Sequence, residues 1–249
     1  KALQNDYCES YWTNTGAMDE VAKYLKYNTL EIRDDVIKMV AGDEIDITID
    51  DEFRAGQGEP RTKEEIYSAM IVLGFLSYYD GYLKIPNKEL MKEFEKALRD
   101  KSFGYVSQII ENSRNMLYAT VNGDTNTVEK ILHDIHNSEI PILQYNDENS
   151  LSCVLTLAYL SARDNYRIER EEKTGKGYAD FTFHPRRRND TAFIVELKKD
   201  EDVDVAINQI KSKEYIETFK KENKNKKVLA VAICYNSKEK EHKCKIEEI

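Results

Sequence analysis

Residues 177–215 read GYADFTFHPRRRNDTAFIVELKKDEDVDVAINQIKSKEY, and this stretch decides the fold of the second half of the chain. Residues 178–183 and 192–198 are short apolar segments that read as strands, and the polar run FHPRRRNDT between them reads as a turn. From Val203 to Phe219, apolar residues recur at the spacing of one helix face. The stretch therefore predicts a β-hairpin followed by a helix.

The segments on either side extend this pattern. Helical spacing from Leu151 to Tyr159 predicts a helix before the hairpin, and YRIERE at 166–171 predicts a further strand. KVLAVAICY at 227–235 is the cleanest strand in the chain, and HKCKIEEI at 242–249 is compatible with a short last one. The order helix, three strands, helix, strand predicts an α/β domain with a mixed central sheet.

The first part of the chain reads differently. We expect residues 1–140 to form a mostly helical domain and residues 141–249 to form the α/β domain, joined by a linker around 137–147. Thr62 to Glu65 form a capping box, and Asn87 is placed to cap the next helix. Other predicted elements are a helix from Asn14 or Thr15 toward Val40, a strand in DEIDITID (43–50), and helices at 102–119 and 125–136.

Composition and charge narrow the class of protein. The chain is 41% hydrophobic and 33% charged, which is typical of a globular protein. No apolar run approaches the ~18–20 residues that span a bilayer, and the start KALQNDYCES has no signal-peptide layout. Four widely spaced cysteines favour reduced thiols. We therefore expect a soluble, cytoplasmic protein without a membrane partner.

Charge is distributed unevenly. Residues 146–249 hold 21 Lys/Arg and 20 Asp/Glu, whereas the first 145 residues hold 16 and 26. An acidic surface repels nucleic acid, and a near-neutral one with local basic clusters can bind it. Charge thus permits nucleic-acid binding by the second half and discourages it for the first. No GxxxxGK[ST] motif is present, so the first half holds no P-loop.

Two carboxylates and a lysine converge on the predicted hairpin. Because side chains alternate along a strand, Glu196 and Lys198 share a face, and pairing of the two strands can place Asp180 beside Glu196. Adjacent carboxylates favour a cation between them, and Mg²⁺ accepts such oxygen ligands. Lys198 could then position or help deprotonate an attacking water.

The triplet (D/E)xK alone has little specificity. It also occurs at Glu171-Glu172-Lys173, Glu222-Asn223-Lys224 and Glu241-His242-Lys243. Only Glu196-Leu197-Lys198 ends an apolar strand that follows an aspartate on a neighbouring strand. From the pattern alone, a solvated strand end with an ordinary Glu/Lys pair remains the alternative reading.

The same stretch resembles the PD-(D/E)XK nuclease-like domain at the C-terminus of bacterial AAA-ATPase-like proteins. Such domains carry a G-[RY]-x-D strand, an apolar strand ending in E-[LF]-K, and a helix with a Q-I pair before K-x-Y. The matching segments here are Gly177 to Asp180, Phe193 to Lys198, Gln209-Ile210 and Lys213 to Tyr215. Residues 66–94 resemble the helical region that joins the ATPase core to the nuclease-like domain. The resemblance extends over roughly residues 60–249 and implies a restriction-endonuclease-like fold.

The resemblance also implies roles for individual residues. Asp180 and Glu196 would bind Mg²⁺ or Mn²⁺, and Lys198 would be the catalytic lysine. Glu148, at the start of the first helix, would lie beside the metal, and Gln209 would approach a metal-bound water or a phosphate.

Further basic residues are candidates for nucleic-acid contact. These are Arg186, Arg187 and Arg188 in the hairpin turn and Lys199 after the motif lysine. An exposed arginine turn that is simply solvated is an equally good reading of the first three.

Two functions remain open at this point. One is a metal-dependent nuclease, a hydrolase of phosphodiester bonds that acts on DNA in preference to RNA. The other is a catalytically inactive nuclease fold that binds nucleic acid or supports assembly. In both, the resemblance implies regulation by an ATPase module that lies outside this chain.

Overall fold

The computed structural model describes residues 30–47, 49, 60, 62–101, 104–136, 148–170, 180–188, 190–212 and 215–249. The described residues up to Gly104 form one compact unit, and those from Tyr105 onward form a second. None of the helices in these described ranges has the length and hydropathy that crossing a bilayer requires.

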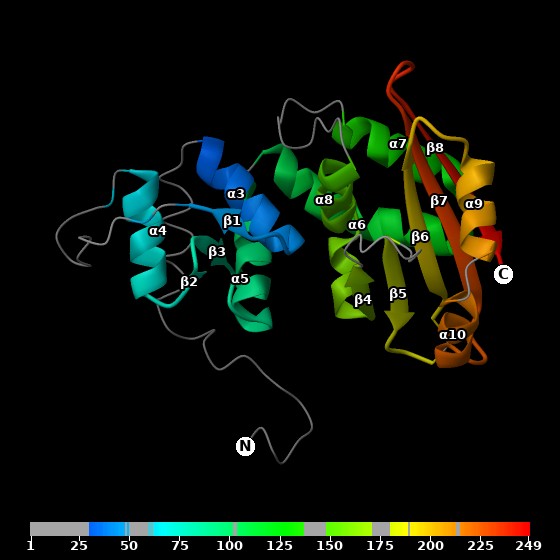
Figure 1. Ribbon diagram of the computed structural model, residues 1–249, viewed down its shortest axis with the longest axis horizontal. Coiled ribbons are helices and arrows are strands. Elements are labelled where there is room, and N and C mark those ends of the chain that lie inside the picture. The colour runs from blue at the N-terminus through cyan, green and yellow to red at the C-terminus, as the bar shows by residue number, and fades with distance from the viewer. Residues whose placement is uncertain are drawn as a thin grey trace, which may run out of the picture. The chain divides into compact units, whose positions relative to one another are not determined.

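The first unit combines helices with a small three-stranded sheet (Figure 1). Its described elements are α3 (Leu30–Ala41), β1 (Ile45–Asp46), α4 (Lys63–Val72), β2 (Ser77–Tyr79), β3 (Tyr82–Lys84) and α5 (Lys88–Leu98). The strand order is β1-β3-β2, and both pairings are antiparallel. The strand predicted in DEIDITID is thus present as β1. The predicted cap at Asn14 or Thr15 lies outside the described residues.

Local hydrogen bonds set where α4 and α5 begin. The Thr62 hydroxyl accepts from the Glu65 amide and the Glu65 carboxylate accepts from the Thr62 amide, both at 3.2 Å. This reciprocal pair is the capping box that the sequence predicts. The Asn87 side chain caps α5 by accepting from the amides of Glu89 and Leu90. Both predicted helix starts are confirmed.

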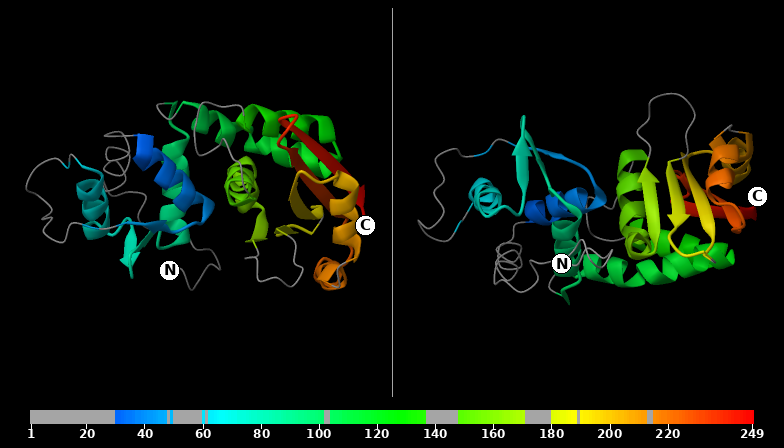
Figure 2. Two further views of the ribbon diagram at one scale, coloured as in Figure 1. Left: turned by 45° about the horizontal axis from the view of Figure 1, so that its top comes forward. Right: turned by 90° about the horizontal axis from the view of Figure 1, so that it is seen from below.

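The second unit is built on a five-stranded mixed sheet (Figures 1 and 2). The strand order is β4-β5-β6-β7-β8, with β6 and β7 parallel and every other pair antiparallel. The strands are β4 (Tyr166–Arg170), β5 (Phe181–Pro185), β6 (Ala192–Lys199), β7 (Val228–Asn236) and β8 (Glu241–Glu248). The helices are α6 (Tyr105–Asn122), α7 (Thr125–His136), α8 (Glu148–Ala158), the 3₁₀ turn η3 (Leu160–Asp164), α9 (Val203–Ser212) and α10 (Tyr215–Glu222). The mixed sheet flanked by helices is the predicted fold class.

Alternating side chains of β6 bury both faces of this sheet. On one face Phe193 stacks on Phe183 at 4.1 Å between ring centroids, and Tyr159 at the end of α8 contacts both rings. On the other face Ile194 packs in an apolar cluster that α9 and α10 complete. The sheet therefore lies between two helical layers, and each layer fixes which β6 side chains face it.

One predicted helix differs in detail. The helix expected over 203–219 is two helices, α9 and α10, and residues 213–214 between them lie outside the described ranges. The compact units divide at 104/105, so α6 and α7 belong to the second unit. The domain boundary expected at 140/141 stays a prediction. Glu129 on α7 accepts a 2.8 Å hydrogen bond from the Cys244 amide of β8. The predicted linker at 137–147 lies outside the described residues.

Candidate active site

The hairpin of β5 and β6 brings two of the predicted carboxylates together. Phe181 pairs with Val195 in the antiparallel ladder, so Asp180, one residue earlier, comes level with Glu196. The Leu197 amide donates a 2.7 Å hydrogen bond to Asp180 Oδ2. This bond anchors the Asp180 carboxylate to the neighbouring strand, directly after Glu196.

Glu196 is a buried acid with a lysine beside it. Its relative exposure is 2%, and Lys198 Nζ lies 3.2 Å from its Oε1. Burial of a carboxylate is costly unless a cation or hydrogen-bond donors compensate it. By strand alternation both side chains share the sheet face of Ile194, which packs under α9. The motif glutamate and lysine thus form an ion pair on the α9 side of the sheet.

A buried cysteine neighbours Lys198 on the next strand. Cys234 on β7 is the register partner of Lys198 in the parallel ladder. Burial, helped by the carboxylates of Asp202 and Glu201 and opposed by Lys198, raises the pKa of the Cys234 thiol to about 12. The thiol is therefore neutral at pH 7. Sequence reasoning missed this neighbour, although the parity of the two parallel strands carries the signal.

The corner after β6 is held by a second aspartate. Asp200 has a left-handed backbone, with φ at 58°. Its carboxylate accepts from the Ser237 amide and the Ser237 hydroxyl, each at 2.7 Å to Oδ1. These bonds hold the pKa of the Asp200 carboxyl below its usual range. The corner leading from Lys199 to α9 is thereby tied to the β7–β8 turn, which the sequence did not indicate.

The donor set fits a hard divalent cation held by two protein carboxylates. Asp180 and Glu196 are adjacent, and Mg²⁺ commonly takes one or two carboxylates with water and phosphate oxygens completing its shell. Thr182, two residues along β5 from Asp180, has a buried hydroxyl without a hydrogen-bond partner among the described residues. Among all described residues, no group of three or more His, Cys, Asp or Glu side chains is arranged to hold a metal ion. Two carboxylates are thus the ligands that this chain's described residues offer.

Two other predicted residues lie on helices around the hairpin. Glu148 is the first residue of α8, but its side chain lies outside what the structure describes. Gln209 lies on α9, is half-buried and makes an interaction within the chain. Since Ile194 and Glu196 face α9, Gln209 belongs to the helix on the same side of the sheet as the ion pair.

The predicted arginines lie at the other end of the hairpin. Arg186, Arg187 and Arg188 are exposed in the turn after β5, whereas Asp180 precedes that strand. Six residues of strand correspond to about 20 Å. Lys199, by contrast, follows Lys198 directly and is half-buried. A nucleic-acid chain contacting both the arginines and the carboxylates must therefore run along the length of β5.

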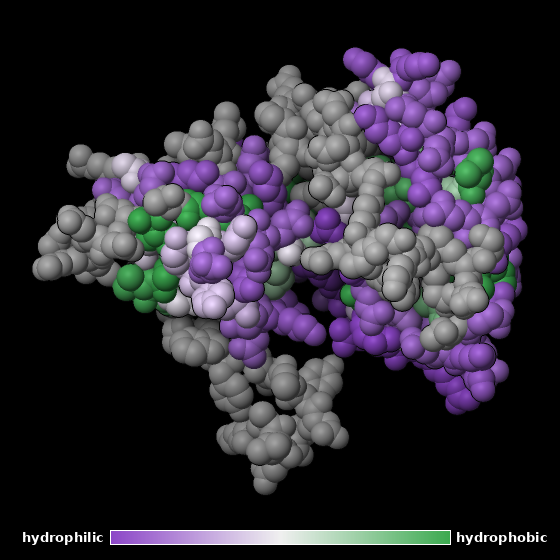
Figure 3. Space-filling model, in the orientation of Figure 1, coloured by the Kyte–Doolittle hydropathy of each residue, from purple (hydrophilic) through white to green (hydrophobic). Residues whose placement is uncertain are grey.

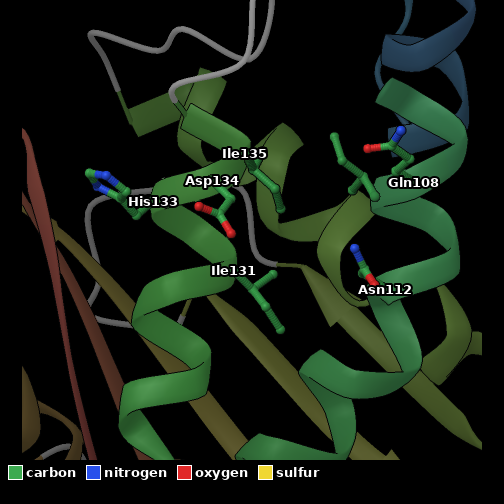
Figure 4. Close-up of a pocket in the computed structure, with 7 residues that line it drawn as sticks. Gln108, Asn112, Ile131, His133, Asp134 and Ile135 are labelled. Carbon is green, nitrogen blue, oxygen red and sulfur yellow. The ribbon is translucent and has the colours of Figure 1, made fainter. Parts of the chain in front are cut away.

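A groove of about 470 Å³ with a mixed polar and apolar lining lies elsewhere in the second unit, between α6 and α7 (Figure 4). Its lining residues are Gln108, Ile109, Asn112, Ile131, His133, Asp134 and Ile135. None of the predicted catalytic, metal-binding or nucleic-acid-binding residues lines it. The groove is therefore separate from the hairpin site.

Comparison with known proteins gives a family match over part of the second unit. No curated protein and no solved structure matches the chain. Residues 146–244, which include Asp180, Glu196 and Lys198, match the model of the PD-(D/E)XK nuclease superfamily, whose members generally use divalent metal ions.

Proposed function

We propose that the second unit is a metal-dependent nuclease that hydrolyses phosphodiester bonds of DNA, or of RNA. The observation that carries the proposal is the buried Glu196, paired with Lys198 and adjacent to the anchored carboxylate of Asp180. The superfamily match over the same residues supports it. The cofactor would be Mg²⁺ or Mn²⁺.

In this proposal Asp180 and Glu196 bind the cation, which would lower the pKa of a bound water and polarise the phosphate when present. Asp180 keeps Oδ1 for this purpose because Oδ2 accepts from the Leu197 amide. Lys198 pairs with the Glu196 carboxylate that would also bind the cation. With a cation at Glu196, the Lys198 ammonium would be available to hydrogen-bond to the attacking water or to stabilise charge developing on the phosphate.

The remaining predicted residues would serve the substrate. Glu148 and Gln209 would position water or phosphate around the carboxylates, and Lys199 with the arginine turn would bind the nucleic-acid backbone. A bacterial setting and regulation by an AAA-ATPase-like module belong to the same proposal, since they rest on the sequence resemblance. A cytoplasmic setting belongs to it as well and rests on the widely spaced cysteines.

The decisive experiment compares Lys198→Met with Lys224→Met. Both remove a lysine from an (D/E)xK triplet, but Lys224 is exposed in the turn after α10. We expect Lys198→Met to slow metal-dependent cleavage of DNA or RNA on the order of 10²-fold or more. Lys224→Met should cleave at the wild-type rate. Cleavage that survives Lys198→Met unchanged would defeat the mechanism.

Metal binding is tested separately from cleavage. Mg²⁺ or Mn²⁺ should raise the melting temperature of the wild type, because ligand binding stabilises the folded state. Asp180→Asn and Glu196→Gln should lose this shift, and Lys198→Met should keep it. Nucleic-acid binding that requires metal but never leads to cleavage would establish the inactive, binding form of the fold instead.

A further inference from the structure

Exposed apolar side chains concentrate in one short segment of the first unit. Among the described residues seven large hydrophobic side chains are exposed, and five of them lie between positions 72 and 82. We call Val72, Leu73, Tyr79 and Tyr82 the tyrosine patch; the fifth side chain, Tyr78, alternates with Tyr79 along β2 and leaves the opposite face of the sheet. Figure 3 shows hydrophobic surface gathered around α4, which ends at Val72. Single exposed apolar side chains are normal on a protein surface, whereas a cluster of them often marks an interaction site.

The β2–β3 hairpin presents two of these rings rigidly. Asp80 and Gly81 form its two-residue turn, with φ of 50° and 88°, the left-handed pair that tight hairpins require. Tyr79 and Tyr82 are direct cross-strand partners, so their side chains leave the same face of the sheet. Their relative exposures are 81% and 48%. The opposite face carries Leu83, which is fully buried.

Backbone hydrogen bonds fix the rest of the patch to this hairpin. The amides of Phe75 and Leu76 both donate to the Met70 carbonyl, which ties the end of α4 to the start of β2. The Tyr78 hydroxyl donates to the Ile47 carbonyl at 3.4 Å. The patch is therefore ordered before any partner arrives, and binding would cost little conformational entropy.

The charges around the rings are mostly negative. Asp46 on β1 is the register partner of Tyr82 and shares its face, and Asp80 lies in the turn. Lys84, two residues after Tyr82 on β3, is paired with Glu44 at 2.6 Å. Residues 1–104 hold 14 Lys/Arg and 21 Asp/Glu. Phosphate groups are disfavoured at such a surface, whereas a cationic side chain gains both carboxylate and ring contacts.

We propose that the tyrosine patch is a docking surface for an arginine-containing basic segment of a protein partner. Guanidinium groups stack on exposed tyrosine rings and hydrogen-bond to carboxylates, which is the combination that Tyr79, Tyr82 and Asp46 present. Docking here is independent of the hairpin site, which belongs to the other unit of the chain.

The test uses the full chain and a labelled peptide of alternating Arg and Gly, with an alternating Glu and Gly peptide as the negative probe. Fluorescence anisotropy should show binding of the arginine peptide that weakens as salt rises. The double variant Tyr79→Ser/Tyr82→Ser should weaken it at least about tenfold, as expected when central aromatic anchors are lost. Asp46→Lys should weaken it as well.

Tyr118→Ser is the matched control. Tyr118 is 72% exposed on α6 in the second unit and has no part in the patch, so this variant should bind the peptide as the wild type does. Equal binding by wild type and the double variant overturns the proposal. It is also overturned if the double variant loses self-association or oligonucleotide binding while keeping the arginine peptide. The melting temperature of the double variant should equal that of wild type, which shows that lost peptide binding does not come from misfolding.

Discussion

His242 should make the second unit sensitive to acid. The residue lies on β8, is buried, and contacts Tyr235 and His136 with ring centroids at 5.0 and 5.5 Å. Burial, together with the charges of the neighbouring His136 and His133, lowers the pKa of His242 to about 3. In the unfolded chain the same imidazole titrates near 6.5.

The sign of the effect follows from this difference. Below pH 6.5 the unfolded chain binds a proton that folded His242 does not, so the folded state loses stability as pH falls. The stabilisation is complete above pH 6.5 and declines toward pH 3. Each pH unit in this window costs about 1.4 kcal/mol, so lowering the pH to 5 should remove about 2 kcal/mol.

Hydrogen exchange of β7 and β8 peptides measures this loss for the second unit alone, which matters because a chain of two units need not unfold in one step. The exchange rates are corrected for intrinsic exchange and converted to a free energy of unfolding. Between pH 7.5 and pH 5 this free energy should fall by about 2 kcal/mol more in wild type than in His242→Phe. His184 and His136 also have lowered pKa values, but they are present in both proteins and cancel in the comparison. His133→Gln removes only the smallest of the contributions that lower the His242 pKa, so this exposed variant should lose nearly as much as wild type. An equal loss in wild type and His242→Phe would refute the reasoning.

Two further predictions concern the hairpin turn and a helix start. If Arg186, Arg187 and Arg188 contact phosphates, changing all three to Ala should reduce the slope of log affinity against log salt by up to about 3, measured by titration at several salt concentrations. An unchanged slope moves the phosphate contacts elsewhere, with Lys199 the first residue to test. Thr62→Ala removes the hydroxyl that accepts from the Glu65 amide, one of the two bonds of the capping box, and should destabilise α4 by about 1 kcal/mol, measured by hydrogen exchange, whereas Thr62→Ser should not. Equal protection in both variants would mean that tertiary packing alone holds the helix start.

Features that depend on neighbours in sequence could be predicted. The starts of α4 and α5 follow from Thr62 and Asn87, whose side chains bond amides two or three residues away. The β5–β6 hairpin follows from alternation and from the turn between its strands. The relation of Asp180 to Glu196 follows from that hairpin, because pairing across a short turn leaves little choice of register.

Features that depend on distant segments could not. Nothing in Ser237 indicates that it binds Asp200, because the two residues meet only when β6 and β7 lie in parallel. Cys234 beside Lys198 also depends on the pairing of β6 with β7, and strand parity fixes only the face on which each side chain lies. The packing of α7 within the second unit brings Glu129 to Cys244, which lies 115 residues later. Helix periodicity shows that α7 has an apolar face but not which strand that face covers.

The packing of α7 against β8 matters for the choice of fragments of this protein. β8 is the outermost strand of its sheet, and an uncovered outer strand offers its amides and carbonyls to any other chain in extended form. A fragment cut at the family boundary, near residue 146, would contain every residue of the hairpin site but would lack Glu129 and the helix that carries it. In such a fragment the exposed edge of β8 could pair with β8 of another molecule, and the fragment would aggregate. An inactive fragment of this kind would then say nothing about the activity of the hairpin site. Fragments for activity measurements should begin before Tyr105.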